Sequence, residues 1–125
     1  MKLGIDVGCV LHGEYYTLDY ALKLEAMVKR NFSCPVRFHI WTEEARQVPR
    51  HWIKHNLTDL GVNGPRKSWW YKVQIFRNKD FNGRLFYFDL DIVITGNLDW
   101  MLALSEERFW AVRDFRYLWK KNKWT

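Results

Sequence analysis

The first third of the chain shows two different spacings of apolar residues, and each spacing predicts an element. Residues 3–11 are almost all apolar and several are β-branched, and the turn-prone residues 12–14 follow them, which predicts a strand and then a loop. Residues 17–31 place apolar side chains at helical spacing, with Thr17 as a candidate N-cap. Residues 36–41 predict a second strand. Because the helix between the two strands supplies a crossover, we expect the strands to be parallel.

The middle of the chain carries a weaker pattern. Residues 47–67 contain two prolines and two glycines among their turn-forming residues, and they predict an irregular segment. Residues 52–60 could hold a short helix or a short strand. Ser68 is a candidate N-cap for a helix over residues 69–78, in which several apolar side chains fall on one side.

Residues 85–88 begin the most informative segment. They are all apolar, as in a strand that is buried on both faces of an α/β sheet. Asn97 is a candidate N-cap for a helix through Leu104, and residues 109–112 predict a further strand. The elements together predict an α/β fold with a Rossmann-like, open, mostly parallel sheet and flanking helices.

Composition limits the class of protein. The 125 residues carry 20 Lys+Arg against 14 Asp+Glu, a net charge of +6, and 48% of them are hydrophobic. Such a chain can bury a core as a single domain over residues 1–125, which excludes a disordered tail. No apolar run approaches the ~20 residues that a membrane span needs, so we expect no membrane segment. Cys9 and Cys34 lack the spacing of a disulfide framework or a zinc site, which favours a reducing cytoplasm.

The basic residues are unevenly distributed along the chain. Between Arg46 and Arg84, nine basic residues stand against two acidic ones, and a second basic run ends the chain. We favour a solvated surface as the interpretation of these charges. Binding of nucleotide phosphates or nucleic acid is the alternative.

Asp89 and Asp91 directly follow the apolar run of residues 85–88, at the carboxyl end of a predicted strand. Open α/β sheets bind their ligands at that end. Side chains two residues apart on an extended chain leave the same face, so we expect both carboxylates to point the same way. Two carboxylates suit Mg²⁺ or Mn²⁺, with a diphosphate completing the coordination. Solvated loop aspartates are the weaker interpretation, because residues 92–94 are apolar as well.

Residues 69–99, WWYKVQIFRNKDFNGRLFYFDLDIVITGNLD, resemble the DxD segment of GT-A-fold glycosyltransferases related to glycogenin and the bacterial galactosyltransferases. In that family a helix with a basic residue leads into an apolar strand, the DxD motif and a short helix. The first strand, helix and second strand also match, so the resemblance covers nearly the whole chain. It implies a GT-A nucleotide-diphospho-sugar transferase fold and the transfer of a sugar from a UDP- or GDP-sugar to an unknown acceptor.

The resemblance also implies roles for individual residues. Asp89 and Asp91 would hold Mn²⁺ or Mg²⁺ on the diphosphate, with Asp89 also near the ribose, and the metal would act as a Lewis acid on the departing nucleoside diphosphate. Lys72 matches the basic residue that faces the nucleotide-sugar, although its spacing to Asp89 is one residue longer than in glycogenin. The loop that receives the nucleoside in that family corresponds to Leu11, His12, Gly13 and Tyr16. In this loop glycine permits close approach of the backbone, and tyrosine can stack on a base. A solvated lysine and an ordinary turn histidine remain the alternatives for Lys72 and His12.

The chain is short for this family. A complete GT-A domain is about twice as long, by the usual size of large α/β domains, and relatives place a third metal ligand and the acceptor-side residues beyond the matched segment. We therefore expect the N-terminal, nucleotide-binding part of a longer domain. The missing half, or a second copy of the chain in a homo-oligomer, would cover its open sheet edge and apolar face.

Two other classes of protein compete with this interpretation. Residues 89–94 also fit the first motif of haloacid-dehalogenase-like phosphatases, in which the first Asp is a nucleophile and the second an acid or base. The further acidic pair of those enzymes has no counterpart here, and their motif usually opens the domain. A basic nucleic-acid-binding module would use aromatic stacking platforms, for which the candidates are Trp69, Trp70, Tyr71, Tyr117 and Trp119. Aromatic residues at these spacings are more often core, so nucleic acid is not the expected partner.

Overall fold

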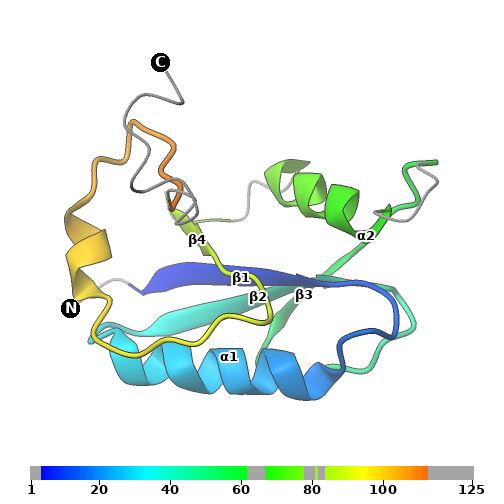
Figure 1. Ribbon diagram of the computed structural model, residues 1–125, viewed down its shortest axis with the longest axis horizontal. Coiled ribbons are helices and arrows are strands. Elements are labelled where there is room, and N and C mark those ends of the chain that lie inside the picture. Colours follow the sequence, from blue (N-terminus) through cyan, green and yellow to red (C-terminus); the bar gives the residue numbers. More distant parts are fainter. Residues whose placement is uncertain (1–3, 62–66, 78–80, 82–83, 113–125) are drawn as a thin grey trace, which may run out of the picture.

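The computed structural model describes residues 4–61, 67–77, 81 and 84–112, and in these residues four strands form a sheet between helices (Figure 1). The strands are β1 (Ile5–Leu11), β2 (Val36–Thr42), β3 (Ile53–Asn56) and β4 (Leu85–Tyr87). All the strand pairings are parallel, and the order in the sheet is β3-β2-β1-β4. The prediction of an α/β fold with an open parallel sheet is thus confirmed.

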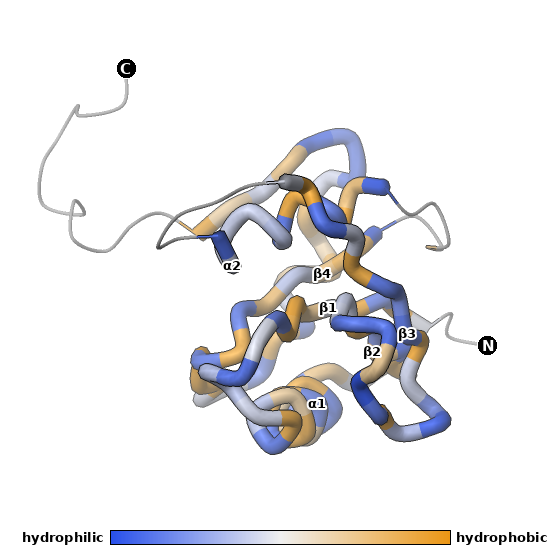
Figure 2. The backbone as a smooth tube through the Cα atoms, turned by 90° about the vertical axis from the view of Figure 1, so that its right-hand side faces the viewer, coloured by the Kyte–Doolittle hydropathy of each residue, from blue (hydrophilic) through white to orange (hydrophobic). Residues whose placement is uncertain are grey.

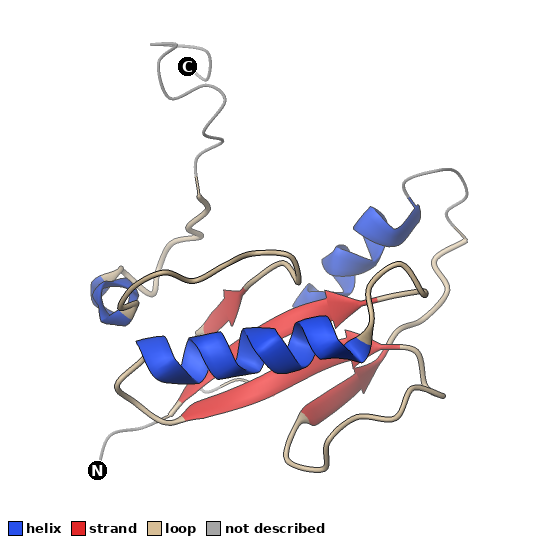
Figure 3. Ribbon diagram, turned by 60° about the horizontal axis from the view of Figure 1, so that its bottom comes forward, coloured by secondary structure: helices blue, strands red, loops and turns tan. Residues whose placement is uncertain are grey.

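Helices lie on both faces of the sheet. The helix α1 (Leu18–Asn31) covers one face, and α2 (Lys67–Trp70) lies on the other side and continues into a 3-10 helix, η1 (Tyr71–Arg77) (Figures 1 and 3). A further 3-10 helix, η2 (Asp99–Ala103), follows β4. Figure 2 shows the same layers in a view turned by 90°, with β1, β2 and β3 between α1 and α2. None of the described helices is long and apolar enough to cross a membrane.

The β–α–β start of the chain is confirmed. Strands β1 and β2 pair in parallel along their whole length, and α1 forms the crossover between them. Thr17 occupies the N-cap position as predicted, but its side chain makes no capping hydrogen bond. The charges at the two ends of α1 still favour the helix, because Asp19 lies in its first turn and Lys29 and Arg30 lie in its last. The short element within residues 52–60 is a strand, β3.

Three predictions for the second half of the chain are wrong in detail. Ser68 lies inside α2 rather than at its N-cap. The helix near Asn97 begins at Asp99 with Leu98 as its N-cap, and the Asn97 side chain instead accepts a hydrogen bond from the Asp99 amide at 2.8 Å. Residues 109–112 are exposed and take part in no strand pairing within the described part of the chain.

The face of the sheet that packs on α1 is apolar. Val7 and Cys9 of β1 and Phe38 and Ile40 of β2 are buried there against residues of α1 such as Leu24. Burial raises the pKa of the Cys9 thiol, so this cysteine stays neutral and contributes only packing. Side chains two residues apart on each strand share this face, which is why the alternate positions lie on the other one.

The opposite face, under η1, contains aromatic side chains. Val10 and Trp41 form a cluster there with Tyr71 and Ile75 of η1. Gly8 makes room for the Trp41 ring, because a Cβ at this position would lie 2.5 Å from a ring carbon. A side chain at residue 8 would therefore push the indole off β1.

A hydrogen-bonded polar chain crosses three strands on this second face. Asp6 Oδ1 lies 2.7 Å from His39 Nε2, and His39 Nδ1 lies 2.9 Å from His55 Nε2. At its partly exposed end, Arg37 Nη2 donates to Asp6 Oδ2 at 2.6 Å. Because Asp6, His39 and His55 are all buried, these hydrogen bonds replace partners that water would otherwise supply.

The segment after β4 returns along α1 (yellow in Figure 1). Ile92 and Ile94 pack against the core on the α1 side. The Ile94 amide lies 3.4 Å from Met27 Sδ, and the Leu98 amide donates to the Asn31 carbonyl at 2.7 Å. These contacts fix the chain that follows the DxD motif.

Candidate functional site

The carboxyl edge of the sheet contains a topological switch point. Strand β1 lies between β2 and β4, so the strand order runs outward from β1 through β2 to β3 and then returns to β4 on the other side of β1. Open α/β sheets bind their ligands at such a point. The loop after β1 begins at His12, and Asp89 follows shortly after the end of β4. The fold thus brings the loop predicted to receive the nucleoside and the DxD segment to one edge.

The loop after β1 is held by residues that follow β2. Gly13 has a φ of +77°, a conformation that favours glycine. Its amide donates to Glu43 Oε1, and its carbonyl accepts a hydrogen bond from Arg46 Nη2 at 2.6 Å. Arg46 also pairs with Glu43 Oε2 at 3.0 Å. No atom would lie within 4 Å of a Cβ at Gly13, so this part of the loop borders open space.

Glu43 is the charged anchor of this loop. Partial burial by itself raises the pKa of its carboxyl, but hydrogen bonds from the Gly13 amide, its own amide, the Thr42 hydroxyl and the Arg46 side chain together lower the pKa to about 2. The group is therefore ionised at neutral pH. Sequence reasoning did not select Glu43; its place directly after the second predicted strand, at the ligand-binding edge, was the available signal.

His12 joins the β1 loop to the helices above the sheet. Its Nδ1 lies 3.0 Å from the Ser68 hydroxyl oxygen, and its ring stacks on Tyr71 with ring centroids 4.0 Å apart. The side chain of Leu11 is fully buried in the core, so only its main chain is placed to reach a ligand.

Asp89 has two donors on one carboxylate oxygen. Lys72 Nζ lies 2.6 Å from Oδ1, and the Tyr87 hydroxyl donates to the same atom at 2.8 Å. Burial raises the pKa of Tyr87, and the negative charge of Asp89 raises it further, so the phenol stays a neutral donor. The structure therefore places the predicted basic residue of η1 against the first carboxylate of the motif.

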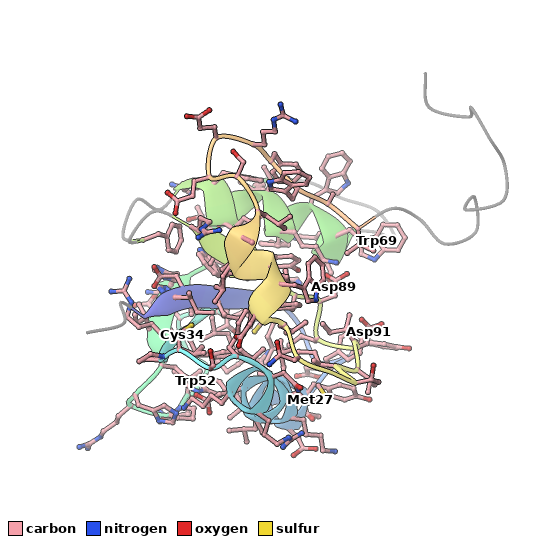
Figure 4. All side chains as sticks on the ribbon, turned by 90° about the vertical axis from the view of Figure 1, so that its left-hand side faces the viewer. Met27, Cys34, Trp52, Trp69, Asp89 and Asp91 are labelled. Carbon is pink, nitrogen blue, oxygen red and sulfur yellow. The ribbon has the colours of Figure 1, made fainter. Side chains whose placement is uncertain are left out.

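Asp91 is the more exposed of the two carboxylates, and its Oδ2 accepts a hydrogen bond from the Tyr16 hydroxyl at 3.2 Å. Desolvation and the nearby Asp91 charge both raise the pKa of Tyr16, which stays a neutral donor. The prediction that both carboxylates leave one face of an extended chain is wrong, because β4 ends at Tyr87 and residues 90–91 form a turn. Both aspartates nevertheless lie on the same side of the molecule, below Trp69 in Figure 4.

The donor set at this edge is compatible with a hard divalent cation. Among the described residues, no group of three or more His, Cys, Asp and Glu side chains comes together as a metal site. Asp89 and Asp91 would supply two carboxylates, both accessible to solvent. Mg²⁺ and Mn²⁺ accept carboxylate oxygens together with water and phosphate oxygens, so two protein ligands fit when a diphosphate supplies others.

The aromatic residues considered as stacking platforms separate into two groups. Trp69 and Trp70 are exposed on α2, whereas Tyr71 is buried beneath His12 and cannot stack on a base. Tyr117 and Trp119 lie outside the described residues. The described aromatic side chains therefore offer two exposed rings of the five predicted, both on one short helix.

Comparison with protein-family models, curated proteins and solved structures finds no significant match to this chain.

Proposed function

We propose that the chain binds the diphosphate of a nucleotide-sugar at the carboxyl ends of β1 and β4, as the donor-binding part of a metal-dependent glycosyltransferase of the GT-A type. The observation that carries the proposal is the convergence of Gly13, Tyr16, Lys72 and the two aspartates Asp89 and Asp91 on one topological switch point. The strand order β3-β2-β1-β4 supports it, because nucleotide-binding Rossmann folds contain the same order.

The side chains at this edge divide into anionic and cationic groups. Asp89 and Asp91 would hold Mn²⁺ or Mg²⁺, and Lys72 provides a positive charge for a phosphate oxygen. The metal, when bound, would supply Lewis-acid stabilisation of charge on the diphosphate. Haloacid-dehalogenase-like catalysis, in which Asp89 would be the nucleophile, is less favoured because three strands precede the motif, which usually opens the domain in those enzymes.

The β1 loop shapes the other side of the proposed site. The Gly13 amide is engaged by Glu43, so glycine contributes close approach of the backbone rather than a donor to phosphate. Tyr16 donates a hydrogen bond to Asp91, which supports a role for its ring beside the proposed metal position, where it would stack on the base of a nucleoside.

Calorimetric titration of variants tests this function. The wild-type chain is expected to bind UDP or GDP only when Mn²⁺ is present. Asp91→Asn is expected to lose this metal-dependent binding while changing the free energy of unfolding by less than about 0.5 kcal/mol, because Asp91 is exposed.

Asp19→Asn is the matched control, since Asp19 is an exposed carboxylate on α1 that pairs with Lys23. This control is expected to bind like the wild type. Equal nucleotide affinity in Asp91→Asn and wild type would contradict the proposal, as would salt-sensitive binding of oligonucleotides in place of the nucleoside diphosphate.

A further inference from the structure

The ammonium group of Lys72 lies close enough to Asp89 to repel a metal ion that binds this carboxylate. Lys72 Nζ is 2.6 Å from Asp89 Oδ1, and Tyr87 donates to the same oxygen. A divalent cation that approaches Asp89 therefore meets a carboxylate with one oxygen fully engaged. It also meets a positive charge at contact distance from that oxygen, which repels it.

The backbone that carries Lys72 is fixed, whereas the side chain can move. Its neighbours Tyr71 and Ile75 on η1 are buried in the aromatic cluster on the sheet. The Lys72 side chain itself is 41% exposed, and the Asp89 side chain is 45% exposed. A lysine has a long flexible stem, so the ammonium can leave Asp89 without displacing η1.

We propose that the Lys72 ammonium pairs with the Asp89 carboxylate when no ligand is bound, and that it moves to the diphosphate when metal and nucleotide bind together. This role of Lys72 rests on the proposed function, and it determines how metal binding and nucleotide binding depend on each other. The divalent ion alone competes with Lys72 for Asp89 and binds weakly. The diphosphate offers the ammonium a second anionic partner, which releases Asp89 to the metal.

Metal and nucleotide then strengthen each other's binding. The coupling is reciprocal: the factor by which the nucleoside diphosphate tightens metal binding equals the factor by which the metal tightens nucleotide binding. Part of this factor depends on the positive charge of residue 72. Removing that charge is expected to strengthen metal binding alone and to weaken the coupling.

The test measures free Mn²⁺ by electron paramagnetic resonance in mixtures with the folded chain, first without nucleotide and then with UDP. The variants are Lys72→Met, which keeps the length of the side chain without its charge, and Lys72→Gln, which keeps some polarity. Lys67→Met is the matched control, because Lys67 lies on the adjoining α2 and its Nζ pairs with Asp59 Oδ1 at 3.8 Å.

Without nucleotide, Lys72→Met and Lys72→Gln are expected to bind Mn²⁺ about twofold to fivefold more tightly than the wild type and Lys67→Met, the effect of losing a half-exposed ion pair. With UDP, the gain in Mn²⁺ affinity is expected to be smaller in both Lys72 variants than in the wild type. Equal Mn²⁺ affinity of Lys72→Met and Lys67→Met without nucleotide would overturn the inference.

The two proposals fail in different ways. If UDP leaves the Mn²⁺ affinity of the wild type unchanged, the nucleotide-binding function fails and so does the transfer of Lys72 to a diphosphate. If UDP tightens Mn²⁺ binding equally in the wild type and in Lys72→Met, the function stands and the role of Lys72 is overturned.

Discussion

The two faces of the sheet are built on different principles. The face against α1 is an apolar cluster in which Val7, Phe38, Ile40 and Leu24 bury one another. The face under η1 combines aromatic rings with a buried polar chain, of which His39 is the centre. The apolar face is stabilised by its buried apolar area and by close packing of side-chain volume. Many combinations of side chains meet these two requirements. The second face depends on particular pairs, because a buried polar group without its partner is costly.

The proposed site is continuous with the second face. Tyr71 belongs to the aromatic cluster and also stacks on His12, while Tyr87, at the end of β4, bonds Asp89. The α1 face also contributes, because Leu90 and Ile92, which flank Asp91, pack with its cluster, and Tyr16 packs there and donates to Asp91. The second face therefore supports the site at Asp89, and the α1 face supports it at Asp91.

Truncating a buried side chain on the face that packs on α1 should have the largest effect on stability. Phe38→Ala is expected to lower the free energy of unfolding by about 4 kcal/mol, because it removes a buried ring and leaves a cavity between β2 and Trp52. Urea denaturation followed by tryptophan fluorescence measures this change. The exposed Val93→Ala is the control and is expected to change stability by less than about 0.5 kcal/mol. A loss under about 1 kcal/mol for Phe38→Ala would remove the distinction between the faces.

Breaking the polar chain should come second. Asp6→Asn replaces the carboxylate that serves both His39 and Arg37, and an amide can offer an oxygen to only one of them and meets the other with its NH2 group. The expected loss is about 2 kcal/mol, within the range for a buried polar group that loses its partner. The same substitution at Asp19, whose pair with Lys23 is exposed, is expected to cost less than about 1 kcal/mol. Unfolding curves that coincide for Asp6→Asn and wild type would show that the polar chain does not stabilise the second face.

The smallest effect is expected at Glu43, at the site edge, and it depends on pH. The pKa of Glu43 is about 2 in the folded chain against an ordinary value of 4.5, so folding is favoured when this group is ionised. Its contribution is complete above about pH 4.5 and is lost as the pH falls toward about 2. The stability difference between wild type and Glu43→Gln, measured by urea denaturation across this range, should shrink as the pH falls. A difference that stays constant over the range would contradict the role of Glu43 as a charged anchor.

The sequence predicts the first elements well because their periodicity is local. The strand of residues 3–11, the helix that follows and the second strand correspond to β1, α1 and β2. Residues 109–112 look like a strand by composition, but a strand also needs a neighbour to pair with, and the described residues provide none at that place. The short β3 was ambiguous because four residues carry too little pattern to separate strand from helix.

The candidate site was predictable only in part. Asp89 and Asp91 could be selected because an apolar run precedes them, and Lys72 because of the family resemblance; their roles stay predictions. The contact of Gly13 with Glu43 joins residues 30 positions apart, and that of Lys72 with Asp89 joins residues 17 positions apart. Such pairs depend on how the loops settle at the sheet edge, which local spacing does not encode. The turn at residues 90–91 likewise could not be predicted from the apolar residues on either side of the motif.

Backbone amide shifts, recorded by ¹H–¹⁵N nuclear magnetic resonance during titration with UDP and Mg²⁺, test the proposed nucleotide site most directly. The predicted result is that the amides of His12, Gly13, Asp89 and Asp91 shift together and saturate at one UDP concentration, while the amide of Asp6, at the opposite end of β1, does not shift. An absence of shifts in the folded chain, or shifts that leave out the carboxyl edge of β1 and β4, would contradict nucleotide binding at this edge.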